Sequence, residues 1–242
     1  MMSATSALHP HASAATRTGP LHVQNEDAHL KLPEAGLYVV ADGIGGLADG
    51  AVASRVVVEM LTRMVVPGDS LDTRVQQARD AISRANTALF LAGREAQAAM
   101  GTTVVVVLVG EDCAVCLWAG DSRGYLMRQG QLHRVTTDHA IFARISDELP
   151  PRSMVTRAVG PDESVDLDCV VFDLEVGDSL FLCTDGVCGS VPEERLEALL
   201  DLGVPVTADH LVAEAVTRGT RDDATAVVIR MCGEEATHVT HG

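Results

Sequence analysis

The sequence predicts an α+β domain in which two mostly antiparallel sheets pack face to face, with pairs of helices on the outside. The apolar pattern gives a strand first, then two helices, many strands, two more helices and a final strand. Short turns such as Gln129-Gly130 separate neighbouring strands, which favours hairpins and antiparallel pairing. Because two adjacent helices cannot both be crossovers between parallel strands, this order argues against a doubly wound fold.

In the first half of the chain, a short apolar run at 37–41 predicts a buried strand that stops at Asp42-Gly43. Apolar residues at helical spacing predict helices over 49–66 and 70–93, the second ending at Gly93. β-branched runs predict strands over 102–109 and 113–119.

In the second half, residues 122–128 and 131–135 are expected to form a hairpin. Strands over 165–172 and 179–183 are expected to pair across the turn at 175–178. Helices over 192–200 and 207–218 then precede a last strand over 225–231.

Composition limits the classes of protein to consider. The 242 residues are 47% apolar and 21% charged, which fits one globular domain, expected over 12–232, with flexible tails at 1–11 and 233–242. The net charge of −16 argues against binding to nucleic acid or to anionic membranes. No apolar stretch is long enough for a membrane span.

The six cysteines favour a reducing compartment. Cys113 and Cys116 form a CxxC pair, but no second CxxC or histidine pair stands at zinc-binding spacing. We therefore favour buried reduced thiols over a metal or redox pair. The N-terminus lacks the pattern of a secretory signal, so a cytoplasmic location is expected.

Four aspartates each stand beside a predicted strand end. They are Asp42, Asp121, Asp185 and Asp222, and three of them adjoin glycine. Any one of them alone is best explained as a plain turn. If the strand ends converge, however, the carboxylates form a cluster of hard oxygen ligands, which would bind Mg²⁺ or Mn²⁺ rather than zinc.

A series of motifs in this order resembles a known family. The motifs are Asn25-Glu26-Asp27, Val40-Ala41-Asp42-Gly43-Ile44-Gly45-Gly46, Gly101-Thr102-Thr103, Ala119-Gly120-Asp121-Ser122-Arg123, Thr184-Asp185-Gly186 and Asp222-Asp223-Ala224-Thr225. Together they are similar to those of the metal-dependent Ser/Thr protein phosphatases of type 2C, in their bacterial stand-alone form. The resemblance covers about residues 12–231 and implies a four-layer αββα sandwich.

The resemblance also implies roles for the acidic residues. Asp42 would bridge two Mn²⁺ or Mg²⁺ ions, with the Gly43 carbonyl as a further ligand. Asp185 and Asp222 would complete the first ion's ligands, Glu26 would support the second directly or through water, and Asp121 with Asp185 would hold a third. Asp27 and Asp223 would lie behind these ligands. A metal-bridged hydroxide would then attack phosphorus in line, which makes Asp42, Asp121 and Asp185 the catalytic set.

Three departures from the family pattern affect substrate binding or proton transfer to the leaving oxygen. His22 stands where the family has an arginine that grips phosphate, so Arg17 or Arg123 would compensate, or His22 is an ordinary solvated loop residue. Ile44 replaces a histidine of eukaryotic members. The flap at about 138–156 is short, and Pro150-Pro151 is expected to make it a stiff turn.

These features predict a monomeric enzyme that hydrolyses phosphoserine and phosphothreonine on proteins. By analogy it would oppose a Hanks-type kinase, with type VI secretion control as one setting. One alternative is a catalytically weak module of the same fold that binds phosphoproteins. Another is a metal-activated hydrolase of small phosphoesters.

Overall fold

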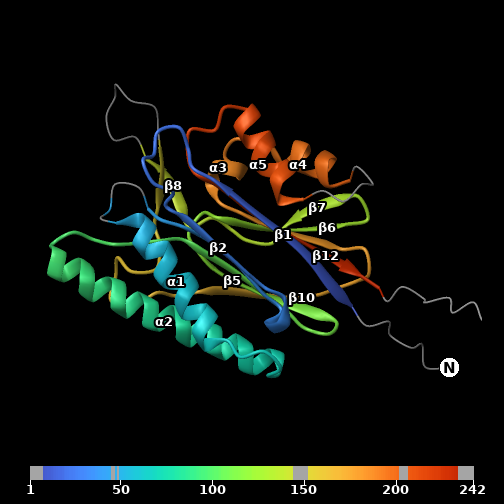
Figure 1. The fold of residues 1–242 in the computed structure, drawn as a ribbon, viewed down its shortest axis with the longest axis horizontal. Coiled ribbons are helices and arrows are strands. Elements are labelled where there is room, and N and C mark those ends of the chain that lie inside the picture. Colours follow the sequence, from blue (N-terminus) through green and yellow to red (C-terminus); the bar gives the residue numbers. More distant parts are fainter. Residues whose placement is uncertain (1–7, 45–46, 48, 144–151, 202–206, 234–242) are drawn as a thin grey trace, which may run out of the picture.

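Two five-stranded antiparallel sheets form the centre of the molecule, and helices cover their outer faces (Figure 1). The computed structural model describes residues 8–44, 47, 49–143, 152–201 and 207–233. The layers run helices, sheet, sheet, helices, so the predicted four-layer α+β sandwich is confirmed.

The strands follow one another in each sheet by antiparallel pairing. In order across the first sheet they are β1 (His9–Arg17), β12 (Ala224–Cys232), β11 (Ser179–Cys183), β6 (Arg123–Arg128) and β7 (Gln131–Arg134). In the second they are β10 (Asp168–Asp173), β5 (Cys113–Ala119), β4 (Val104–Val109), β3 (Leu37–Asp42) and β2 (Asp27–Leu32), the last two joined by a 3-10 turn at Pro33–Ala35. A separate pair, β8 (Ala140–Ala143) and β9 (Arg152–Val155), lies within the predicted flap.

The helices divide between the two outer faces. The second sheet is covered by α1 (Gly50–Met64) and α2 (Leu71–Ala96), and the first by α3 (Asp185–Cys188), α4 (Glu193–Leu200) and α5 (Ala208–Thr217). Apolar side chains fill three clusters between the four layers. The run 104–109 is buried throughout because its alternate residues enter the clusters on both faces of the second sheet.

Two predicted details of the elements are wrong. The second helix continues through Gly93 to Ala96 and ends at Gln97, which is left-handed at φ 54°. Gly93 is instead needed for packing, because a Cβ there would lie 2.9 Å from the Ala98 carbonyl oxygen.

The strands expected to pair across 175–178 lie in different sheets. β10 pairs with β5, whereas β11 pairs with β6 and β12. The Leu174 amide donates to the Asp112 carbonyl beside β5, and buried Asp178 accepts from Arg128 of β6 at 2.9 Å. The turn therefore passes from one sheet to the other. The local sequence pattern does not predict this, because it depends on which distant strands β10 and β11 pair with.

The N-terminal boundary also differs from the prediction. Residues 9–11, expected in the tail, are the first of β1, which pairs with β12 along its whole length. This strand was missed because small and polar residues dominate it. The expected turn at Pro150-Pro151 and the C-terminal tail beyond Gly233 lie outside the described residues.

The cysteine prediction agrees with the structure. All six cysteines are free thiols. Cys113 and Cys116 stand three residues apart on β5, so their side chains leave opposite faces of the sheet and cannot form a pair. Burial in the core between the sheets raises the pKa of Cys116.

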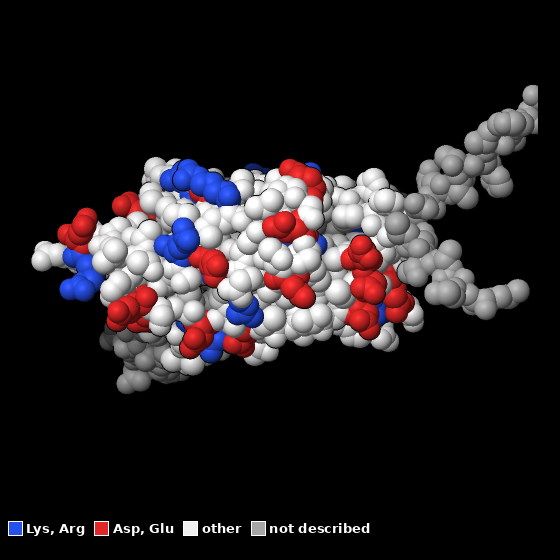
Figure 2. Space-filling model, turned by 90° about the horizontal axis from the view of Figure 1, so that it is seen from below, with Lys and Arg blue, Asp and Glu red and all other residues white. Residues whose placement is uncertain are grey.

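The outer surface is charged but mixed in sign. Seen from the side on which α1 and α2 lie, acidic and basic side chains are interspersed (Figure 2). No helix in the described part of the chain is long and apolar enough to cross a membrane.

Replacement of Asn86 by alanine should destabilise the fold by about 2–3 kcal/mol, because it leaves buried backbone groups without partners. The Asn86 amide donates to the carbonyls of Asp162 and Glu163 and accepts from the Gly160 amide at 2.7 Å. Chemical unfolding measures the change. Thr87→Ala, on the exposed side of the same turn, is the control, and an equal loss in both variants would contradict the assignment.

Candidate active site

A cavity of about 510 Å³ opens where strand ends of both sheets meet. Its lining is dominated by carboxylates, which come from segments far apart in the sequence. The residues that line it are His22, Glu26, Asp42, Gly43, Ile44, Thr103, Asp121, Ser153, Met154, Val155, Asp185 and Asp222. The structure therefore brings together the four aspartates that the sequence placed at strand ends.

The backbone around Asp42 is fixed by two threonines. Thr102 Oγ1 and the Thr103 amide both donate to the Asp42 carbonyl at 2.8 Å, and the Asp42 amide donates to Thr103 Oγ1 at 3.1 Å. Gly43 must be glycine, because a Cβ there would lie 2.3 Å from the backbone of Gly50 at the start of α1. The Gly101-Thr102-Thr103 motif thus orients the aspartate at the end of β3.

Repulsion among the carboxylates is the main electrostatic feature of the cavity. Burial raises the pKa of Asp42 well above its usual range, and the neighbouring aspartates raise it further. Burial, with Asp222 and Asp121 nearby, raises the pKa of Asp185 to about 6. Burial also raises the pKa values of Glu26 and Asp121. Without a cation, these groups cannot all be ionised at neutral pH.

Asp27 lies behind the cavity and is subject to the same burial and repulsion. It is opposite Asp42 in the β2–β3 register, and Thr184 Oγ1 donates to its Oδ2 at 2.8 Å. Burial raises the pKa of Asp27 to about 7. Its Oδ1 atom, like Oδ1 of Asp185, is buried without a hydrogen-bond partner among the described residues.

These features fit hard divalent cations. The donors are carboxylate oxygens and a backbone carbonyl, which suit Mg²⁺ and Mn²⁺. Buried oxygens with no partner are rare in proteins, and a cation would compensate them. Asp42, Asp185 and Asp222, with the Gly43 carbonyl, Glu26 and Asp121 around them, are the residues that could hold such ions.

Asp223 fixes the loop that carries Glu26. Its Oδ1 accepts from the Gly19 amide at 2.7 Å, and its Oδ2 accepts from the Glu26 amide at 2.6 Å. The side chain is only 2% exposed. The second aspartate of the Asp222-Asp223 pair therefore holds residues 19–26 against the start of β12.

His22 is part of the same cluster and not a solvated loop residue. Its Nδ1 lies 3.0 Å from Asp223 Oδ2, and its Nε2 lies 3.6 Å from Asp222 Oδ1. The interaction with Asp223 raises the pKa of His22, although burial opposes it. The donor atoms of these three residues are within 4.8 Å of one another. Two backbone amides also bind Asp223, and His22 Nδ1 is buried without a hydrogen-bond partner among the described residues.

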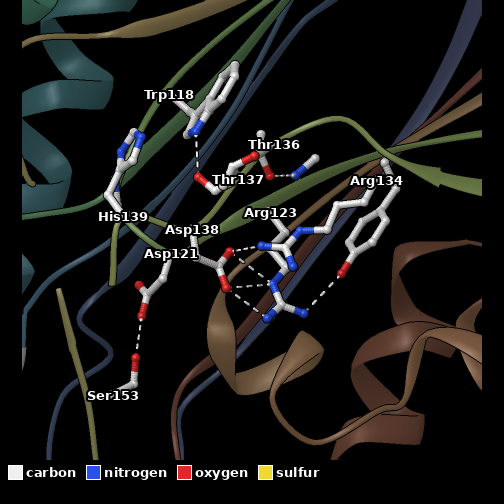
Figure 3. Close-up of polar contacts among 12 residues, drawn as sticks. Trp118, Asp121, Arg123, Arg134, Thr136, Thr137, Asp138, His139 and Ser153 are labelled. Atoms are coloured by element: carbon white, nitrogen blue, oxygen red, sulfur yellow. Dashed lines mark hydrogen bonds and ion pairs between the residues drawn. The ribbon is translucent and has the colours of Figure 1, made fainter. Parts of the chain in front are cut away.

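Neither arginine suggested as a substitute phosphate ligand lines this cavity. The Arg123 guanidinium binds Asp138, with Nη2 2.9 Å from Oδ2, and Arg134 reaches the same carboxylate (Figure 3). Arg17 lines a neighbouring cavity instead. His22 is therefore the basic residue that the described structure places in the lining.

A second group of residues, missed in the sequence, positions Asp121. The His139 amide donates to the Gly120 carbonyl at 2.8 Å, and the Gly120 amide donates to His139 Nδ1 at 3.2 Å. The ring's other nitrogen, Nε2, lies 3.2 Å from Asp168 Oδ2 and 3.1 Å from Arg157 Nη1. The ring stacks on Trp118 (Figure 3). The Thr137-Asp138-His139 motif was the feature of the sequence that could have indicated this role.

The flap reaches Asp121 as well. Ser153 of β9 donates from its Oγ to Asp121 Oδ2 at 3.3 Å (Figure 3). The Thr156 amide donates to the His139 carbonyl at 2.8 Å, which ties together the two ends of the flap. Asp121 is thus held between a strand end of the second sheet and the flap.

Comparisons with known proteins agree on one family. The family model for protein phosphatase 2C matches residues 22–217. A serine/threonine phosphatase, Stp, of Listeria innocua is 28% identical over 240 residues, covering 90% of this chain and 95% of the relative.

Solved structures are also similar to this chain over most of its length. PppA, described as a key regulatory component of T6SS in Pseudomonas aeruginosa, is 35% identical with a TM-score of 0.85. The similarity covers 94% of this chain and all of that one. The catalytic domain of the phosphatase PstP, in complex with 2 manganese ions, is 28% identical with a TM-score of 0.77, covering 93% and 99%.

In a chelator, the protein should become less stable as the pH rises from 5 to 7.5. Asp27 and Asp185 bind protons more tightly when folded, with pKa values of about 7 and about 6 against 3.8. The unfolded chain therefore holds fewer protons in this window, and stability falls with pH. We expect the Tm to drop by at least about 5 °C.

Scanning fluorimetry with and without Mn²⁺ measures this effect. Excess Mn²⁺ should abolish the decrease, and Asp27→Asn, which keeps an acceptor for Thr184, should reduce it. A Tm that rises across the same range in chelator would show that the carboxylates do not repel one another.

Replacement of His139 by leucine should weaken Mn²⁺ binding at Asp121, because the Gly120 amide loses its acceptor. Titration calorimetry should show the weakest binding step reduced at least threefold, with the tighter steps unchanged. His139→Asn offers an oxygen near the position of Nδ1 and should restore part of the affinity. Equal weakening of all steps in both variants would indicate a general structural role only.

Proposed function

Because the chain belongs to the protein phosphatase 2C family and is a protein serine/threonine phosphatase, we propose that it works with two divalent ions, Mn²⁺ or Mg²⁺. The observation that supports this most strongly is the convergence of five carboxylates, from both sheets, in one cavity. PstP, a structural neighbour, is described with 2 manganese ions. The unpartnered buried oxygen of Asp185 supports the same proposal.

In this proposal Asp42 would hold both ions, with the Gly43 carbonyl as a further ligand. Asp185 and Asp222 would complete the first ion's ligands, Glu26 would support the second, and Asp121 with Asp185 would hold a weaker third. Ions bound there would lower the pKa of a water molecule that attacks phosphorus and would neutralise charge on the phosphoryl oxygens.

The protein's own contribution is to fix these ligands before substrate arrives. Thr102 and Thr103 hold the Asp42 backbone, and Asp223 holds the Glu26 amide. Such preorganisation matters because the ligands need not move when charge develops in the reaction. Ile44 cannot supply a proton to the leaving oxygen, so we propose that water in the cavity does so.

His22 is proposed to attract the substrate phosphate. It lines the cavity, and three nearby carboxylates favour its protonated form. A histidinium presents fewer donors than the arginine of other family members and cannot bind phosphate through a planar fork. Weaker phosphate binding is therefore expected for this chain than for members that have arginine here.

The substrates are phosphorylated proteins, and we propose that the enzyme opposes a Hanks-type kinase. Its similarity to PppA, a regulatory component of T6SS, supports type VI secretion control as the setting. The free thiols of all six cysteines support a cytoplasmic location.

A catalytically weak module that binds phosphoproteins is the second candidate, and the histidine at position 22 is the feature that favours it. A hydrolase of small phosphoesters is distinguished by comparing a phosphopeptide with a sugar phosphate. Robust turnover of a phosphoserine peptide would exclude the binding module. A preference for the phosphopeptide over the sugar phosphate would exclude the hydrolase of small phosphoesters.

Asp42→Asn should lower kcat/KM for a phosphoserine peptide in Mn²⁺ by at least about 100-fold, or roughly 2.7 kcal/mol. The substitution removes the charge that both ions share but keeps the side-chain shape. The unchanged protein should lose activity in EDTA and regain it with Mn²⁺. Malachite-green detection of released phosphate measures the rates.

Asp166→Ala, which changes an exposed aspartate before β10, is the matched control and should keep full activity. Circular dichroism checks that both variants are folded. A folded Asp42→Asn protein with more than about a tenth of the activity, or full turnover in EDTA with metal-free protein, would contradict the proposal.

A further inference from the structure

A second cavity, of about 400 Å³, adjoins the candidate active site. It is formed by the end of β1 and the loop after it, 17–20, and by the loop 219–222 that precedes β12, with Val216 of α5 behind them. Asp222 lines both cavities. A substrate chain whose phosphoresidue occupies the first cavity would therefore pass close to the second.

Two arginines supply positive charge to the lining of this second cavity. Arg17 and Arg221 line it, both are exposed, and neither side chain has a hydrogen bond or ion pair in the described part of the chain. Other arginines near the active site are neutralised: Arg123 by Asp138 and Arg157 by Asp168. In a chain with a net charge of −16, this cavity thus has two unpaired guanidinium groups in its lining against one carboxylate, that of Asp222.

Thr220 lines the cavity as well. It is 9% exposed, and its Oγ1 atom is buried with no hydrogen-bond partner among the described residues. Gly219 is left-handed at φ 81°, which turns the chain just before Thr220 and Arg221. An anion in the cavity would pair with the guanidinium groups of Arg17 and Arg221.

We propose that this cavity is a substrate subsite for an anionic group that flanks the phosphoresidue on the same protein chain, either a carboxylate side chain or a second phosphate. The inference deepens the proposed phosphatase function and depends on it. Its physical basis is that a strongly acidic enzyme repels acidic substrates at long range, so their selection requires local cations beside the active site.

The test compares kcat/KM, in Mn²⁺, for three phosphoserine peptides of one sequence. One has aspartates on both sides of the phosphoserine, one has asparagines there, and one has asparagines and a second phosphoserine. We expect both anionic peptides to be preferred over the neutral one by about fivefold, the range of exposed ion pairs. The larger of the two preferences identifies the favoured anion.

Arg221→Glu should reduce the preference for each anionic peptide to one or below. The Arg17→Glu/Arg221→Glu protein should prefer the neutral peptide. Arg84→Glu, an equal charge change at an exposed position of α2, should leave the preferences as they are. In about 0.5 M NaCl the preference of the unchanged protein should fall toward one, because exposed pairs are screened.

A preference of one in the unchanged protein, or an equal change in the Arg221→Glu and Arg84→Glu proteins, would overturn the subsite. Non-hydrolysable phosphonate versions of the peptides, bound in Mn²⁺ and followed by fluorescence anisotropy, separate this result from a failure of the proposed function. Absence of turnover overturns the phosphatase mechanism, whereas equal binding of neutral and anionic phosphonates overturns the anion subsite.

Discussion

The mutual repulsion of buried carboxylates is the constraint on which the rest of this structure depends. Five acidic side chains face one cavity, and Asp27 stands behind them. The raised pKa values of Asp42 and Asp185 indicate that ionising these carboxylates together is unfavourable, so hydrophobic packing and hydrogen bonds elsewhere must hold them in place. The two-sheet core supplies much of that support, because Asp42, Asp121, Asp185 and Asp222 each lie beside a strand whose apolar residues pack in it.

Hydrogen bonds complete the support close to the cavity. Thr102 and Thr103 orient Asp42, His139 orients the turn before Asp121, and Asp223 fixes the loop before Glu26. These contacts join segments that are remote in sequence, such as Glu26 and Asp223, which are 197 residues apart. The ligand positions are thus set by the whole fold and not by local turns.

The sequence was sufficient for the layers and for the carboxylates, because both follow from local pattern. Apolar runs mark the strands, and an aspartate at a strand end is visible without a structure. It was insufficient where the pairing of strands that are far apart in the sequence decides the structure. β1 has few large apolar residues and is defined by pairing with β12, while β10 and β11 separate because their partners lie in different sheets. The roles of His139 and Asp223 were hidden because they depend on hydrogen bonds to distant backbone amides.

The pairing of β1 with β12 has a consequence for the synthesis of this protein. Among the described strands, β1 is an edge of its sheet and pairs with β12, with Thr16 and Thr225 in contact across 209 residues. During translation β1 therefore stays without this partner until β12 has left the ribosome. The loop that carries His22 and Glu26 is closed by Asp223 in the same final event. A chain made only as far as β11 therefore has no assembled site, and its acidic residues come together only once β12 has been synthesised.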